Sequence, residues 1–487
     1  MKRILFVMMA TLTASAFSQL IPLKTVPLAT GQQFLFHPAE NGTIGGITLA
    51  LDDSLADPYH NPATGATLNG IRVFTSPLYY GIGLNRGQSG GSSGLTFPLG
   101  MSFRTGNFFG GMTWARQNIS LDESHPPTFG LHNFLPPNFS QPTRDNANTY
   151  TFGMFGFAIP GTAYSVGVSA QWADLNAIDG VQYLYSNAYD LIQKGTITEY
   201  RLGLHGAWEG GRVLDLLVAH QSTDMEHGRP NVIFYPWDGM PYMPNPRYTI
   251  EHDQSHGFAF EASYREPVTA TLNAGVIMVL DLKTYPKIPN YQLMNIPRDP
   301  GDSHAWNFGF GLANNNGKSI LGFDVIYEPA FSETWAEADG SEWVPEGRMI
   351  MLGDRTVTNT FDFYNHVVRV GLRSAVRDIG IGVSFHRFKY YMRQANHILG
   401  TSRRQKEQWT EVTLSLGFGF DVFGGHVKYL GLFTTGAGRP GVTTPWNGGP
   451  RTTLLDTASF MVAPSGQLSL DEAWTGVHQI SFVIQLP

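Results

Sequence analysis

Two arginines stand four residues apart in the segment VVRVGLR (367–373), which otherwise contains only apolar residues and glycine. In an extended strand, Arg369 and Arg373 point to the same face, because side chains alternate between the two faces. Guanidinium groups on one face can bind a carboxylate through paired hydrogen bonds. They can equally neutralise Asp and Glu side chains on adjacent strands. The segment therefore predicts either an anion-binding pair or a pair of structural cations.

Other ionisable residues occupy the same kind of position, on the polar parity of an alternating segment. We expect them to line an enclosed interior, where charges of both signs can pair across strands and set the preference for a permeant. Together with Arg369 and Arg373, the candidate lumen-lining and substrate-binding residues are Arg201, His205, Asp215, Glu261, Arg265, Asp324, His386 and Glu411.

Signatures of catalysis and of metal binding are weak in this sequence. We find no nucleophile elbow, no H-E-x-x-H pattern and no P-loop. His252 and His256 are four residues apart, but at a predicted loop-to-strand junction, which does not favour a metal site. His220, Asp224 and His227 cluster near a predicted outer rim, where polar residues are usually solvated. We therefore predict that the chain is not an enzyme, and we assign no catalytic residue, metal or cofactor.

Strict alternation of apolar and polar residues recurs through most of the chain. In EVTLSLGFGFDV (411–422), every second residue from Val412 to Phe420 is apolar. Many such segments together predict an all-β chain. Two architectures fit this pattern: a soluble sandwich buries the apolar faces, whereas a transmembrane barrel turns them outward to lipid. Further examples are YRLGLHGAW (200–208), HGFAFEASY (256–264), HAWNFGFGL (304–312) and DIGIGVSF (378–385).

Short and long connections alternate between the predicted strands. Tight turns at one end and long loops at the other are typical of an antiparallel outer-membrane barrel, which makes the barrel the preferred fold. A first strand at 69–84, seven hairpins and a closing strand at 477–487 give about sixteen strands. The short links are 104–107, 160–162, 209–211, 265–267, 314–318, 376–378 and 423–425. The long connections are expected near 120–146, 176–196, 223–253, 284–300, 329–357, 393–407 and 437–475.

The N-terminus predicts export. Lys2 and Arg3 precede the apolar run 4–10, and Ala14-Ser15-Ala16 resembles a cleavage site, so residues 1–16 are predicted to be a signal peptide. The sequence contains no cysteine, and we find no later apolar run long enough for a transmembrane helix. Charged residues are 15% of the chain, and the net charge of −7 comes without a long basic tract. This composition predicts no nucleic-acid partner.

Aromatic residues near the predicted strand ends are expected at the two membrane interfaces, where girdles of Trp and Tyr are common. These residues are Trp114, Trp172, Trp208, Tyr327, Tyr390, Tyr391 and Trp409.

The segment GGITLALDDSLADPYHNPATGATL (45–68) precedes the first predicted strand. Its residues Ala50, Asp52, Asp53, Asn61, Pro62, Ala63 and Ala66 resemble the pattern before the first strand of FadL-type outer-membrane transporters and of the related PorV-like barrels. The resemblance implies a barrel of about fourteen strands whose N-terminal segment folds into the lumen as a hatch. By this resemblance, residues 17–68 are the hatch and residues 69–487 the barrel, and Asp52, Asp53, Asn61, Pro62 and Ala63 are the candidate hatch residues.

The preferred interpretation is a transmembrane antiparallel barrel of about 14–16 strands in the outer membrane of a Gram-negative cell. The resemblance implies an outer-membrane transporter of hydrophobic small molecules such as fatty acids or hydrocarbons. A barrel component of a protein secretion or assembly system, and a porin for polar solutes, remain alternatives; a secreted soluble β-enzyme comes last. The expected partners are outer-membrane lipid or lipopolysaccharide and a hydrophobic ligand, with a secretion-system protein under the second interpretation.

Overall fold

The computed structural model describes residues 24, 27, 29–84, 92–122, 143–179, 192–237, 240–284, 302–337, 342–343, 349–397, 400–440 and 470–486. The predicted signal peptide, residues 1–16, lies outside this set. Three short helical turns precede the strands: η1 (Asn41–Ile44), α1 (Asp57–His60) and η2 (Pro62–Thr67). Among the described residues, no helix is long and apolar enough to cross a membrane.

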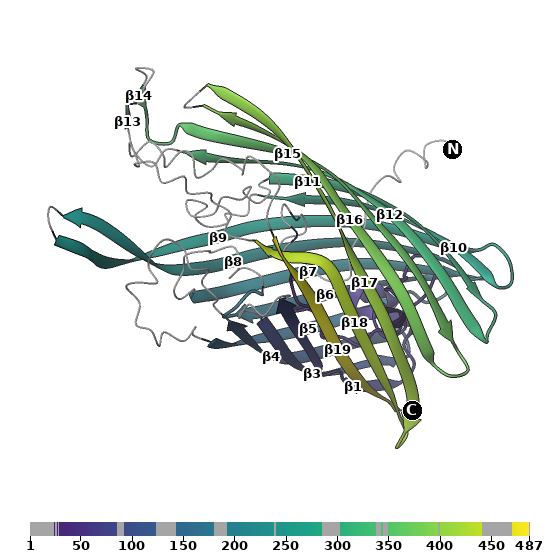
Figure 1. The fold of residues 1–487 in the computed structure, drawn as a ribbon. Coiled ribbons are helices and arrows are strands. Elements are labelled where there is room, and N and C mark those ends of the chain that lie inside the picture. Colours follow the sequence, from purple (N-terminus) through teal and green to yellow (C-terminus); the bar gives the residue numbers. More distant parts are fainter. Residues whose placement is uncertain are drawn as a thin grey trace.

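The described strands form one closed antiparallel barrel (Figure 1). A separate small hairpin consists of β13 (Glu342–Trp343) and β14 (Met349–Ile350). The barrel strands are β1 (Ile71–Thr75), β2 (Leu78–Leu84), β3 (Ser92–Thr105), β4 (Phe108–Asp122), β5 (Thr143–Ala158), β6 (Tyr164–Leu175), β7 (Ile192–Trp208), β8 (Arg212–Trp237), β9 (Met240–Pro267), β10 (Leu272–Lys283), β11 (Asp302–Asn315), β12 (Ser319–Glu337), β15 (Arg355–Ser374), β16 (Ile379–Asn396), β17 (Thr401–Val422), β18 (Gly425–Pro440) and β19 (Leu470–Leu486).

The described barrel has sixteen strands, because β1 and β2 are two halves of one strand. Both halves pair with β3 on one side and with β19 on the other, in a continuous register. They are separated only by Ser76 and Pro77, and proline cannot donate to a ladder. Pairing of β19 with this first strand, from Ile71 opposite Leu486 to Leu84 opposite Ala473, closes the barrel. The count from the sequence is confirmed, and the fourteen strands implied by the family resemblance are two too few.

The apolar parity of the strands faces outward. On β17, Leu414, Leu416 and Phe418 are 54%, 52% and 45% exposed, whereas Glu411 and Ser415 on the other parity are buried. A sandwich would bury the first set, so the sandwich interpretation is wrong for this chain. Outward-facing Leu and Phe side chains on every side of a barrel form a surface suited to hydrocarbon.

Six of the seven predicted short connections are confirmed at one end of the barrel, at the right in Figure 1. The connection expected at 265–267 is wrong, because β9 continues to Pro267 and the turn follows at 268–271. Several of these turns use a glycine with positive φ, including Gly106 at 58° and Gly424 at 77°, a conformation that other residues rarely adopt.

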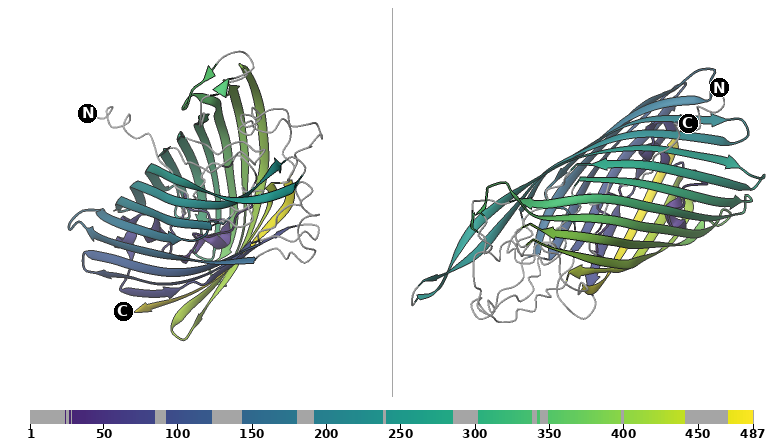
Figure 2. Two further views of the ribbon diagram at one scale, coloured as in Figure 1. Left: turned by 90° about the vertical axis from the view of Figure 1, so that its left-hand side faces the viewer. Right: turned by 90° about the horizontal axis from the view of Figure 1, so that it is seen from above.

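Three of the expected long loops are partly wrong. The stretch 223–253 is almost entirely strand, because β8 continues to Trp237 and β9 begins at Met240. The stretch 393–407 is largely β16 and β17, and 329–357 contains the ends of β12 and β15. In these extensions both parities carry polar residues, as in TSRRQKEQWT (401–410), so alternation disappears although backbone pairing continues. Figure 2 shows the β8–β9 hairpin projecting far beyond its neighbours. Most of the other four stretches lies outside the described residues.

Candidate functional site

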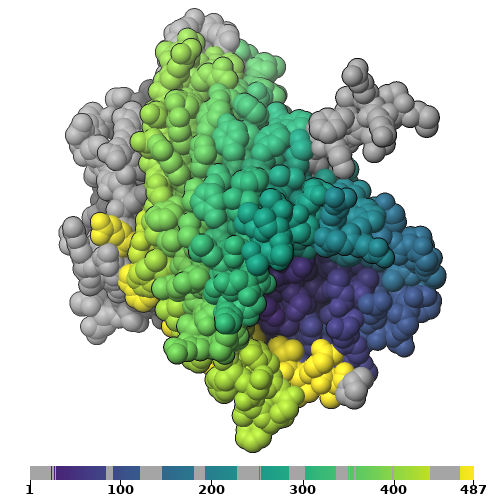
Figure 3. Space-filling view, turned by 90° about the vertical axis from the view of Figure 1, so that its right-hand side faces the viewer, coloured from purple at the N-terminus to yellow at the C-terminus, as the bar shows by residue number. Residues whose placement is uncertain are grey.

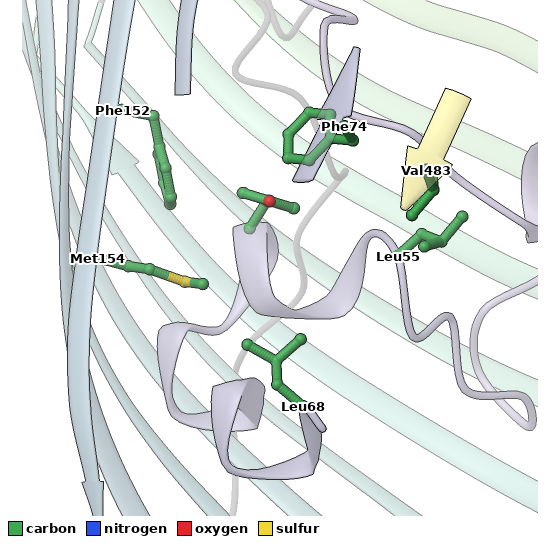
Figure 4. Packing of buried hydrophobic residues seen from close by; sticks show 7 residues of the cluster. Leu55, Leu68, Phe74, Phe152, Met154 and Val483 are labelled. Carbon is green, nitrogen blue, oxygen red and sulfur yellow. The ribbon is translucent and has the colours of Figure 1, made fainter. Parts of the chain in front are cut away.

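The barrel interior holds the chain's own N-terminal segment, which we define as residues 24, 27 and 29–70. Figure 3 looks onto the end with the short turns, where this purple segment is visible inside the mouth. One apolar cluster joins Leu55, Tyr59 and Leu68 of the segment to wall residues such as Phe74 and Phe152 (Figure 4). A second cluster packs Ile44, Ile47, Ala50 and Leu51 against Ala313 and Ile320 of the wall. The segment is therefore packed against the barrel on more than one side.

The predicted lumen residues all occupy inward register positions of their strands, and most of them bind the N-terminal segment. His205 contacts the segment only through the side chain of Asp215. His386 pairs with Glu328 of β12 at 3.1 Å instead of with the segment. The direct contacts come from Arg201, Asp215, Glu261, Arg265, Arg369, Arg373, Asp324 and Glu411. A role of these residues in binding a substrate stays a prediction.

The Asn61-Pro62-Ala63 turn is anchored to β7 and β8. The Asn61 side chain accepts a hydrogen bond from Ala63 N at 3.1 Å and caps η2. Its amide donates to Asp215 Oδ1 at 2.9 Å, and Asp215 also contacts His205 Nδ1 at 2.8 Å. A Cβ at Gly203 would lie 1.9 Å from Asn61 Oδ1, so only glycine leaves room for this turn. The motif that resembles the FadL family is thus fixed to the wall by side chains of two strands.

The helical turn α1 is bound by one cation and one anion of the wall. Arg201 Nη1 donates to the carbonyl oxygens of Tyr59 and His60 at 2.7 and 2.9 Å, at the C-terminal end of the turn. Carbonyl groups at a helix end favour such a cation. His60 Nε2 lies 2.9 Å from Glu261 Oε2. Arg201 also pairs with Glu199 on its own strand, which orients the guanidinium.

The two arginines singled out in the sequence contact different parts of the segment. Arg369 Nη1 donates to Gly46 O at 3.0 Å and lies 3.9 Å from Asp324 Oδ2 of the adjacent strand. Arg373 Nη1 lies 3.1 Å from Glu40 Oε2. Both guanidinium groups therefore bind the N-terminal segment of the same chain. Arg369 also lies close to Asp324 on the adjacent strand, as the interpretation of charge neutralisation predicted.

Asp53 organises the fold of the segment itself. Its Oδ2 accepts from the backbone N–H groups of Glu40 and Asn41, each at 2.8 Å. Its Oδ1 accepts from Leu55 and Ala56 at 3.1 and 3.0 Å, so one carboxylate joins two parts of the segment. The neighbouring predicted residue, Asp52, is exposed and pairs with Arg265 of β9.

Burial raises the pKa of Asp57 well above its usual value, and the nearby Asp53 carboxylate raises it further. The folded segment therefore binds a proton more tightly than the unfolded chain does. The contribution of protonated Asp57 to the free energy of unfolding is therefore full at low pH. It is lost as the pH rises from the usual carboxyl range through the raised pKa.

We expect D57N to reduce this loss, because asparagine keeps the acceptor for Asp53 N but cannot ionise. Hydrogen exchange of the amides of residues 40–57, followed from about pH 4 to about pH 9, measures the effect. Protection should fall with pH in the wild type and fall less steeply in D57N, where the buried Asp53 carboxyl, whose pKa is also raised by burial, still titrates. D302N, at an exposed position on β11, is the matched control. A pH dependence in D57N as steep as that of the wild type contradicts the assignment.

The interior near the loop end holds a buried aromatic cluster that the sequence reasoning missed. We call Phe361, Phe363, Phe388, Tyr390, Met392 and Trp409 the inner aromatic patch. Phe361 and Tyr390 meet at 5.6 Å between ring centroids, and Phe388 stacks on Trp409 at 5.0 Å. The signal was present in FDFY (361–364) and FKYYM (388–392), where apolar residues fall on both parities.

Two residues of this patch were expected in the aromatic girdles at the membrane interfaces. Tyr390 and Trp409 face inward, so this prediction was wrong for them. Trp114, Trp172 and Tyr391 do face outward, at 45%, 51% and 38% exposure. Proximity to a strand end fixes the height of a residue but not its side, which depends on the register.

Cavities of two different sizes lie between the segment and the wall in the described part of the chain. The smaller, about 40 Å³, is lined by Phe34, Phe36, His37, Tyr59 and Arg201, among others. Burial lowers the pKa of His37 well below its usual value, and the charge of Arg201 lowers it further, so this histidine stays neutral. The larger cavity, about 300 Å³, lies beside Glu40 and Arg373 near the short turns. Sites for small ligands usually measure about 300–1,000 Å³, so the smaller cavity cannot hold a ligand of ordinary size.

Comparisons with known proteins give likeness in structure only: no protein-family model matches the chain, and no curated protein matches it. The toluene transporter TbuX of Ralstonia pickettii is 10% identical, with a TM-score of 0.39 over 92% of this chain and 97% of that one. CdiB from Acinetobacter baumannii is 9% identical, with a TM-score of 0.40 over 85% of this chain and 60% of that one. A Pseudomonas aeruginosa FadL homologue is 11% identical, with a TM-score of 0.42 over 94% of this chain and 100% of that one. These solved structures, which include a toluene transporter and a FadL homologue, are what the chain is similar to, at TM-scores of 0.39 to 0.42.

Proposed function

We propose that this chain is an outer-membrane channel for small hydrophobic molecules, with its N-terminal segment acting as a hatch. The observation that carries the proposal is the occupation of the lumen by the chain's own segment. That segment is held by separate polar contacts, from Arg201 and Glu261 at α1 to Arg373 at Glu40. Each contact can break and re-form without unfolding the barrel, because the strand ladders do not depend on it.

The shape of the described interior favours a gated path over an open pore. Sixteen-stranded barrels are wide enough for an aqueous channel when nothing fills them. Here the described residues leave cavities of about 40 and 300 Å³ between segment and wall. Under this proposal a permeant passes when the segment shifts, whereas a porin for polar solutes would keep a continuous opening.

The chemistry of the interior supports a hydrophobic permeant. The inner aromatic patch lies near the loop end, on the inward faces of β15, β16 and β17. These rings are buried in this structure, so an apolar molecule that enters from the loops contacts them once the groups that cover them move, and it does so before it reaches the charged groups around the hatch. Aromatic surfaces with a few polar groups beyond them are common in sites for apolar ligands.

The test is uptake of oleate and of toluene by vesicles that contain the purified full-length chain, with empty vesicles as reference. We expect faster uptake of at least one of them with the chain present. Y390N should lower this uptake roughly tenfold, since it removes an inward ring from the patch. Y391N is the matched control, because Tyr391 is the next residue on the same strand and faces outward.

Heat-modifiable migration on a gel verifies that both variants keep the folded barrel. Equal uptake of every hydrophobic compound with and without the chain contradicts transport. Equal uptake by Y390N and Y391N instead removes the inner aromatic patch from the path.

A further inference from the structure

A dense group of cations lies on the outer surface of the barrel, on two adjacent strands. We call Arg387, Lys389 and Arg393 of β16 and Arg404 and Lys406 of β17 the outer basic patch. These residues share the outward parity of Ile381 and Leu414, which are 63% and 54% exposed. The patch is therefore on the side that faces lipid and not on the lumen side.

The patch begins where the apolar surface ends. On β16 the outward residues run from Ile379 and Ile381 to Phe385, all exposed, and then change to Arg387. The eight residue steps from Phe385 to Arg393 cover roughly 26 Å along the strand, or roughly 19 Å in height at a tilt of about 45°. This direction leads toward the end with the long hairpins. The cations therefore begin at the edge of the apolar surface, with Arg387, and extend to roughly 19 Å beyond Phe385 on the loop side, with Arg393.

The positive charge of the patch is poorly balanced by protein groups. Arg393 stands directly opposite Arg404 in the β16–β17 register, and like charges in such positions repel. Asp362 lies 3.3 Å from Arg393, and Arg387 donates to the neutral Gln408. In the part of the chain that the structure describes, the side chains of Arg404 and Lys406 form neither an ion pair nor a hydrogen bond.

The sign of the outward charge differs on another side of the barrel. On β8, the outward residues beyond the apolar surface include Asp224 and Glu226, which carry the opposite charge. Lys389 lies 4.9 Å above the ring centroid of Tyr391, so an aromatic side chain adds to the same surface. A general excess of positive charge cannot explain the patch, because the whole chain has a net charge of −7.

We propose that the outer basic patch binds the phosphate groups of lipopolysaccharide. This inference rests on the proposed outer-membrane location and goes beyond transport. In that amphiphile, anionic phosphates lie directly above the acyl chains, which is the same order as Arg387 above Phe385. Guanidinium and ammonium groups form charge-assisted hydrogen bonds with phosphate, and one phosphate between Arg393 and Arg404 relieves their repulsion. The bound lipid is then a fixed part of the barrel surface beside β16 and β17.

The experiment uses the delipidated full-length chain in detergent and follows binding of lipid A that carries both phosphates. R393Q/R404Q/K406Q should weaken binding on the order of 100-fold, since each cation near an anionic lipid surface contributes several-fold. The matched control is R212Q/K318Q/R377Q, which removes three exposed cations at the short-turn end. We expect this control to bind like the wild type. Dephosphorylated lipid A should bind the wild type as weakly as diphosphorylated lipid A binds the patch variant.

Three outcomes overturn the proposal. In the first, the patch variant binds diphosphorylated lipid A as tightly as the wild type. In the second, dephosphorylated lipid A or phosphatidylglycerol binds the wild type equally well, which means an unspecific lipid annulus. In the third, inorganic phosphate displaces the lipid at equal phosphate concentration, which means a site for the free anion. Binding is measured without transport, so its failure is distinguishable from failure of the hydrophobic channel.

Discussion

Valine at Gly275 and Gly371 is expected to open the barrel to ions. Both glycines are on inward positions where the backbone of the N-terminal segment lies against the wall. A Cβ at Gly275 would lie 1.7 Å from Leu49 O, and a Cβ at Gly371 would lie 2.2 Å from Ile44 O. These distances are far below van der Waals contact, and the partner atoms are backbone, so the segment has to move. Valine itself suits a strand, so the barrel should still form.

Planar-bilayer recording measures this result. We expect the wild type to show almost no steady conductance and G275V/G371V to show steady open steps, because a displaced segment leaves the lumen of a sixteen-stranded barrel to water. G153V is the matched control, since a Cβ at Gly153 would have nothing within 4 Å. Steady steps in the wild type favour the porin interpretation. A silent G275V/G371V barrel that is folded on a heat-modifiability gel shows that the segment does not close the lumen.

A disulfide between the segment and the wall is expected to have the opposite effect and to stop uptake. A Cβ at Gly322 of β12 would lie 3.6 Å from Ile47 Cβ, within the range that a disulfide spans. The chain has no cysteine of its own, so I47C/G322C can form only this bond within one molecule. Under oxidising conditions the hatch cannot leave the wall at this point. Uptake should fall to the level of empty vesicles and return when a reducing agent is added.

The control for this lock is a disulfide within the wall. Thr413 and Thr434 are register partners on β17 and β18 with their Oγ1 atoms 2.9 Å apart, so T413C/T434C adds a bond without touching the segment. Uptake by this variant should not respond to the reducing agent. If oxidised I47C/G322C transports as fast as its reduced form, the permeant passes without movement of the segment near Ile47, and the hatch mechanism is wrong in that region.

The two experiments address one interface from opposite directions. The first forces the segment away from Gly275 and Gly371, and the second holds it at Gly322. If G275V/G371V conducts ions and oxidised I47C/G322C loses uptake, the hatch must move for transport. If G275V/G371V conducts ions but the I47C/G322C disulfide does not change uptake, the segment closes the pore to ions without having to move at Ile47 for the ligand to pass.

The sequence by itself determined the strand architecture. Alternation has a period of two residues and is visible within each segment, so the apolar parity, the short turns and the count of about sixteen strands could all be predicted. It also determined which ionisable residues face the interior, since Arg201, Glu261, Arg369 and Arg373 follow from the same parity. Where both faces become polar, as in β17 from Thr401 to Thr410, the pattern stops and the strand could not be predicted.

The tertiary structure decided what the inward residues do. Arg201 meets the carbonyl groups of Tyr59 and His60 across about 140 positions of sequence, and Arg373 meets Glu40 across 333. Such pairs depend on the register of every strand between them and on the path of the segment through the lumen. The same holds for Arg393 opposite Arg404, and for Tyr390, whose side of the wall is set by pairing with β15 and β17. Local periodicity carries none of this information, because a contact between distant residues is a property of the closed barrel.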